Sequence, residues 1–74
     1  MKLGLLWYDN DPKKSLELKL TEAATRYKEK FGMDPTVCYI NPAQVDPKQL
    51  TAGKVKIVSA PRVLPNHFWL EIEG

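Results

Sequence analysis

Hydrophobic positions recur with a helical period between Asp11 and Gly32, and the segments on either side show the shorter alternation that is typical of strands. Six apolar residues, three or four positions apart, line one side of the expected helix: Leu16, Leu20, Ala23, Ala24, Tyr27 and Phe31. Asp11 and Pro12 suit an N-cap and a first helical position, and Gly32 suits the left-handed residue that ends a helix. We therefore predict one amphipathic helix over residues 12–31.

Four short strands flank this helix in the sequence. The first, residues 2–8, is apolar and aromatic at both odd and even positions, and the second, residues 36–41, is rich in β-branched and aromatic side chains. Residues 54–59 and 67–73 alternate polar and apolar positions, as strands with one solvated face do. The order strand, helix, strand predicts a right-handed crossover that leaves the first two strands parallel in one sheet.

The predicted fold class is α+β: a four-stranded mixed sheet in the order β-α-β-β-β, with one helix packed on one face. The whole chain, residues 1–74, is expected to form a single domain. We expect the strand side chains that face the helix to be Leu3, Leu5, Trp7, Val55, Ile57, Phe68, Leu70 and Ile72. Because one helix covers only one face, the other face is left for solvent, a partner or a second copy.

Two segments are less determined by their pattern. In the second strand, either of two pairs of side chains could face the helix. One pair is Val37 and Tyr39, and the other is Cys38 and Ile40. Residues 42–53 form a connector, in which Asp46 and Pro47 repeat the N-cap signal and predict a single helical turn through Leu50.

Composition excludes several classes of protein. Of the 74 residues, 43% are hydrophobic and 27% are charged, which is ordinary for a globular domain and argues against disorder. The single cysteine excludes an intrachain disulfide. The apolar run at residues 3–8 is too short for a signal peptide or a membrane span, so we expect a cytoplasmic protein with no membrane contact. The net charge is +2 and the pI is 8.8, just below the pI of about 9 that marks nucleic-acid binding by composition.

The uncovered sheet face, together with the loop at residues 60–66, is expected to form the functional surface. The candidate partner-binding residues are Leu6, Tyr8, Lys54, Lys56, Arg62, His67 and Trp69. Exposed apolar and aromatic groups favour a protein partner or a homodimer. Aromatic side chains interleaved with lysines are also typical of small RNA- or DNA-binding modules. A further alternative is that the 42–53 connector and the loop simply cover these side chains.

Two enzymatic alternatives depend on few residues. Asp9 and Asp11 follow the first strand, where open α/β sheets place ligands, and with Asn41 they could share a divalent cation in a metal-dependent enzyme. Asp11 is, however, already explained as a helix cap. Cys38 and His67 could supply a nucleophile and a base, but no third group is evident, and they are too few for a structural zinc. The sequence therefore favours a non-enzymatic domain with no catalytic residue, metal or cofactor.

Residues 7–12 (WYDNDP) and 38–42 (CYINP) resemble parts of short uncharacterised bacterial proteins, over residues 1–42 of this chain. The resemblance implies a strand, an acidic turn, a helix and a cysteine-containing strand, and it implies no activity. The tyrosine and aspartate that close the first strand are also similar to those of small CRISPR-associated ribonucleases. The chain lacks the second long helix of that ferredoxin-like family, so the catalytic aspartate is not transferred to Asp9.

Overall fold

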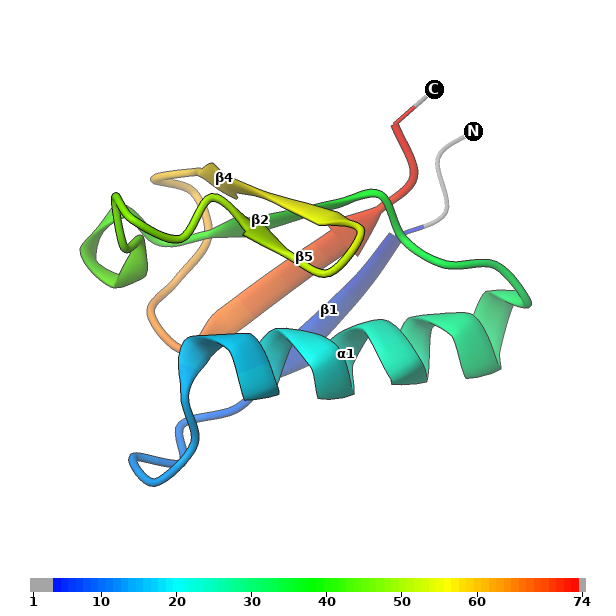
Figure 1. The fold of residues 1–74 in the computed structure, drawn as a ribbon, viewed down its shortest axis with the longest axis horizontal. Helices are drawn as coiled ribbons and strands as arrows, with labels where there is room; N and C mark the ends of the chain where they lie inside the picture. Colours follow the sequence, from blue (N-terminus) through cyan, green and yellow to red (C-terminus); the bar gives the residue numbers. More distant parts are fainter. Residues whose placement is uncertain (1–3, 74) are drawn as a thin grey trace.

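The computed structural model describes residues 4–73, which form one α-helix and a single five-stranded sheet. The elements are β1 (Gly4–Tyr8), α1 (Leu16–Phe31), β2 (Val37–Ile40), a 3₁₀ turn η1 (Pro42–Gln44), β3 (Thr51–Ala52), β4 (Val55–Ser59) and β5 (His67–Glu71). Helix α1 lies across one face of the sheet (Figure 1). The predicted α+β class is confirmed, but the prediction of four strands missed β3, a two-residue strand that pairs with β4 in a tight hairpin.

The strand order is β1-β5-β2-β4-β3, so β1 and β3 are the two edges of the sheet. Strand β5 is antiparallel to both β1 and β2, which therefore point in the same direction, as the crossover predicts. They are not neighbours, because the last strand of the chain lies between them. Among residues 4–73, no helix has the length and apolar character that crossing a bilayer requires.

Helix α1 begins at Leu16, four residues later than predicted. Ser15 is the N-cap, and its Oγ accepts a hydrogen bond from the Leu18 amide at 3.1 Å. Asp11 instead closes a turn by accepting from the Lys13 amide at 2.9 Å. Aspartate and serine both cap helices, and the cap here is Ser15, which directly precedes Leu16, the first residue of the apolar stripe. The predicted C-terminus is confirmed, since Gly32 has φ of 77° and its amide donates to the Lys28 carbonyl.

The core lies between α1 and the sheet. Its fully or almost fully buried members include Leu20, Ala23, Tyr27, Cys38, Ile40, Val55, Ile57, Phe68 and Leu70. Cys38 and Ile40 thus take the helix-facing side of β2, which settles the competition in that strand. Val37 is also fully buried although it lies on the opposite face. The predicted core residues Leu5, Trp7 and Ile72 pack half-buried against this cluster, and Leu3 lies outside the described residues.

The helical turn predicted for Asp46 to Leu50 is wrong. The connector instead has its 3₁₀ turn earlier, at η1, where Asn41 caps the Ala43 amide at 2.9 Å. The Asp46 side chain accepts a hydrogen bond from the Lys48 amide, and the Asp46 backbone carbonyl accepts one from the Gln49 amide. These bonds close a single turn, after which the chain continues to β3. A cap residue followed by proline therefore starts a turn here without starting a helix.

Candidate interaction site

Four of the predicted partner-binding residues lie together on the face of the sheet opposite α1. Leu6 pairs with Trp69, and Tyr8 pairs with His67, across strands β1 and β5. The rings of Tyr8 and His67 are in contact, with centroids 4.8 Å apart. Leu6 is 56% exposed and Tyr8 is 54% exposed. We refer to Leu6, Tyr8, His67 and Trp69 as the β1–β5 patch.

Trp69 is held in one place by two contacts. Its ring lies over Gly4, so that a Cβ at that position would overlap the six-membered ring, with Cη2 only 2.6 Å away. Its indole Nε1 donates to Oε2 of Glu71 at 3.0 Å. Trp69 is therefore a half-buried, oriented side chain of the patch. The role of Gly4 was not predicted from the sequence, although a glycine inside an apolar strand often marks such a close approach.

The loop between β4 and β5 borders the patch. A hollow of about 290 Å³ lies between Leu6, Trp69 and His67 on the sheet and Arg62, Val63 and Leu64 on the loop. The Val63 carbonyl accepts from Nδ2 of Asn41 at 2.9 Å, which ties this loop to the end of β2. Leu64 is 65% exposed, and it was missed as a candidate because an apolar residue in a loop has no periodic signal. The loop leaves Leu6 and Tyr8 more than half exposed, so it does not cover the patch.

The two lysines of the predicted surface are not part of this cluster. Lys56 does lie on the patch side of β4, between the inward residues Val55 and Ile57, but β5 and β2 separate β4 from β1. Lys54 lies on the other side of the sheet, which corrects the prediction. It belongs to the tight turn after Gly53, whose φ is 62°, so the alternation of the strand does not extend to it.

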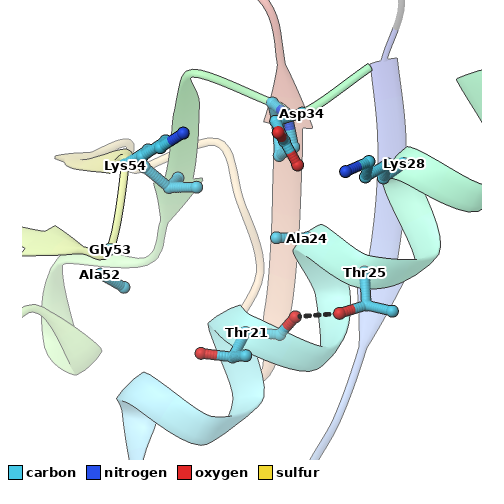
Figure 2. A pocket seen from close by; sticks show the side chains of 10 residues that line it. Thr21, Ala24, Thr25, Lys28, Asp34, Ala52, Gly53 and Lys54 are labelled. Atoms are coloured by element: carbon cyan, nitrogen blue, oxygen red, sulfur yellow. Dashed lines mark hydrogen bonds between the residues drawn. The ribbon is translucent and has the colours of Figure 1, made fainter. Parts of the chain in front are cut away.

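Lys54 lines a groove of about 400 Å³ between α1 and the β3–β4 hairpin. Figure 2 shows Lys54 and Lys28 directed toward Asp34 from opposite walls. The Thr25 hydroxyl on the helix wall donates to the carbonyl of Thr21 at 3.0 Å, so its proton is used within the helix. All five of these residues are exposed. The groove therefore presents ordinary surface side chains around an apolar floor.

The carboxylates proposed for a cation are used in the turn after β1. Asp9 accepts from the Asp11 amide at 3.0 Å and from Lys14 Nζ at 3.3 Å, and Lys14 also contacts Glu22 at 3.0 Å. The amide of Asp11, followed by the ammonium of Lys14, holds the pKa of Asp9 below its usual value. Within residues 4–73, no group of three or more His, Cys, Asp or Glu side chains could hold a metal ion. The geometry thus assigns Asp9 a structural part.

Cys38 and His67 lie on opposite faces of the sheet. Cys38 is fully buried against the helix, and burial raises the pKa of its thiol to about 12. His67 lies beside Tyr8 on the other face, with Nδ1 2.9 Å from the Pro65 carbonyl oxygen. A nucleophile needs its base within hydrogen-bond reach, and this pair does not meet that condition.

No protein-family model matches this chain. Neither a curated protein nor a solved structure matches it. The β1–β5 patch, with Leu6 and Tyr8 more than half exposed on the face opposite α1, is the candidate site that the chain's own residues present.

Proposed function

We propose that this protein is a non-enzymatic interaction domain that binds a protein partner or a second copy of itself through the β1–β5 patch. The observation that carries the proposal is the exposure of three large apolar side chains, Leu6, Tyr8 and Leu64, around the half-buried Trp69. Contiguous apolar groups of this kind mark interaction surfaces, and Trp, Tyr and Arg are the residues that most often dominate their energetics.

The patch is also preorganised. Leu6 and Tyr8 project from a strand, and Trp69 is fixed by its seat on Gly4 and its hydrogen bond to Glu71. Side chains that are already ordered lose little conformational entropy when a partner binds, so more of their burial contributes to affinity. Arg62, exposed at the edge of the hollow, supplies a charged rim to this apolar centre.

Photocrosslinking in the native cell tests this function. A benzophenone amino acid at position 6 places the reactive group in the patch, and the matched control places it at Leu18, which is 45% exposed on the helix. We expect a discrete crosslinked protein species from position 6 and none from position 18. Equal or absent crosslinking at the two positions would contradict the proposal.

A second candidate is binding of single-stranded nucleic acid. It is supported by the aromatic rings of Tyr8, His67 and Trp69 on one sheet face with Arg62 beside them, an arrangement that can stack bases and contact phosphates. It is weakened by the position of Lys54 on the other side of the sheet. Titration with a single-stranded oligonucleotide should then change tryptophan fluorescence, and the affinity should fall steeply with salt. An unchanged emission spectrum would remove this candidate.

A further inference from the structure

The two edges of the sheet differ in how well they are protected. Edge strand β3 has only two residues and leads into the turn that carries Lys54, and short or charged edges resist pairing with other chains. Edge strand β1 has five residues, GLLWY, with no charge and no proline, and none of them is buried. Among the described strands, only β5 pairs with β1. The outer side of β1 is therefore an unprotected edge.

The backbone groups of β1 that face outward can be assigned from the register. The amide of Asp9 donates to the carbonyl of Asn66 at 2.9 Å, which continues the β1–β5 pairing by one residue. In an antiparallel ladder, hydrogen-bonded and non-hydrogen-bonded pairs alternate. Leu5 and Trp7 therefore bond to β5, and the amide and carbonyl groups of Gly4, Leu6 and Tyr8 point away from the sheet. Of these three residues, Leu6 and Tyr8 also carry side chains on the patch side.

We propose that a second copy of this chain docks on this edge, its β1 pairing antiparallel with the first β1; the inference rests on the proposed function and names its partner. The register that pairs all five residues sets Leu6 opposite Leu6 of the second copy. Gly4 then faces Tyr8 in both directions. Each of these three pairs makes two backbone hydrogen bonds, because all three residues have outward groups. The two sheets become one continuous sheet.

The side chains in this register are self-complementary. On the patch side, Tyr8 lies opposite Gly4, whose patch face is covered by the Trp69 ring, so the Tyr8 ring of one copy meets the Trp69 ring of the other, and Leu6 packs against its own copy. On the helix side, Leu5 lies opposite Trp7. The strand carries no charge, so bringing two copies together causes no repulsion along the seam.

A groove lies beside β1 on the helix side. It measures about 280 Å³, and Leu5, Trp7, Arg26, Glu29 and Lys30 line it. Arg26 and Glu29 already pair with each other at 3.4 Å, so Lys30 is the one lining charge that this pair leaves unbalanced in each copy. The Trp7 Nε1 group is buried here and has no hydrogen-bond acceptor among residues 4–73, although such groups normally have one. The edge of the isolated domain thus has outward backbone groups, and Trp7 of the same strand carries a buried donor with no acceptor among the described residues.

Sedimentation velocity over a range of concentrations tests the association. Wild-type protein should move from monomer to dimer below about 1 mM, and Leu6→Lys, which sets like charges opposite each other, should raise the dissociation constant by at least about tenfold. The matched control Leu18→Lys, on an exposed position of the helix, should leave it unchanged. Leu6 is more than half exposed, so the fold should survive, and circular dichroism checks this.

A cysteine at position 6 tests the register independently of affinity. In the proposed pairing, the two Cα atoms at position 6 are about 5.5 Å apart, within the disulfide range of about 4.4–6.8 Å. Leu6→Cys should therefore oxidise to a covalent dimer, while Leu18→Cys should stay monomeric, and the buried Cys38 should not interfere.

The failure of this inference and that of the proposed function can be told apart. A wild-type monomer at all concentrations, with no dimeric disulfide at position 6, would overturn the second copy as partner. If benzophenone at position 6 still crosslinks to a different protein, the proposed function as an interaction domain is retained, and its partner is that other protein. If it crosslinks to nothing, both inferences fail.

Discussion

The ring of Trp69 occupies the space in which a side chain on Gly4 would stand, and this contact joins the first and last strands of the chain on the uncovered face. Strands β1 and β5 pair with Gly4 opposite Glu71, and Trp69 bonds that same glutamate through its indole nitrogen. A large aromatic side chain that covers a cross-strand glycine is a known means of stabilising a sheet edge. The absence of a side chain at Gly4 therefore determines where the Trp69 ring lies in the patch.

Gly4→Ala should destabilise the protein because the added methyl group overlaps the Trp69 ring. An overpacked site of this kind costs about 1–3 kcal/mol in the free energy of unfolding, which urea titration measures. The same substitution in a Trp69→Ala background should cost much less, since the ring is gone. If Gly4→Ala lowered the free energy of unfolding equally in both backgrounds, the Trp69 ring would not be the reason that position 4 requires glycine.

The two tryptophans should respond differently to replacement by phenylalanine. Trp69→Phe removes a hydrogen bond to a carboxylate and should lower the free energy of unfolding by about 1.5 kcal/mol or more. Trp7→Phe removes an indole N–H that has no acceptor within the described residues, so no hydrogen bond is lost and the decrease should be smaller than for Trp69→Phe. Thermal and urea unfolding of both variants gives the comparison. A larger decrease in the free energy of unfolding for Trp7→Phe than for Trp69→Phe would contradict this prediction.

Cys38 should be inert in the folded protein. Burial raises the pKa of its thiol from 9.0 to about 12, so the reactive thiolate is scarce even in mildly alkaline solution, and the side chain is fully enclosed. Alkylation by iodoacetamide at pH 8 should be slow and should accelerate sharply in denaturant. Because the folded pKa is raised, stability should fall as the pH rises above 9. Rapid alkylation under native conditions would argue against this burial.

The parts of the fold that local sequence determines were predicted well. The apolar stripe of α1 and its end at Gly32 follow from residue spacing and from glycine's access to the left-handed conformation. The start of the helix was misplaced because Asp11 and Ser15 are both good caps, and only packing decides between them. Parity correctly placed Val55 and Ile57 of β4, and Phe68 and Leu70 of β5, toward the helix, whereas Glu71, on the outward parity, is also buried.

The parts that depend on distant pairing could not be predicted. No local pattern indicates that β5 inserts between β1 and β2, and this insertion makes β1 an edge. The same insertion brings Leu6 and Tyr8 beside Trp69 and His67, as expected for the uncovered face, but it keeps Lys56 of β4 away from them. Lys54 was misplaced because a two-residue strand precedes it and turns the chain at Gly53, and so short a strand has no period.

The turn after β1 should make stability sensitive to acid. The pKa of Asp9 in the folded protein is lowered below its usual 3.8 by the Asp11 amide first and by Lys14 second. Its stabilising contribution is therefore present above pH 3.8 and is lost as the pH falls below that value through the lower folded pKa. The free energies of unfolding of wild type and Asp9→Asn, measured by urea titration, should converge over that range. In a Lys14→Gln background the convergence should weaken but persist, because the backbone amide still favours the carboxylate; its complete loss would make Lys14 the dominant cause.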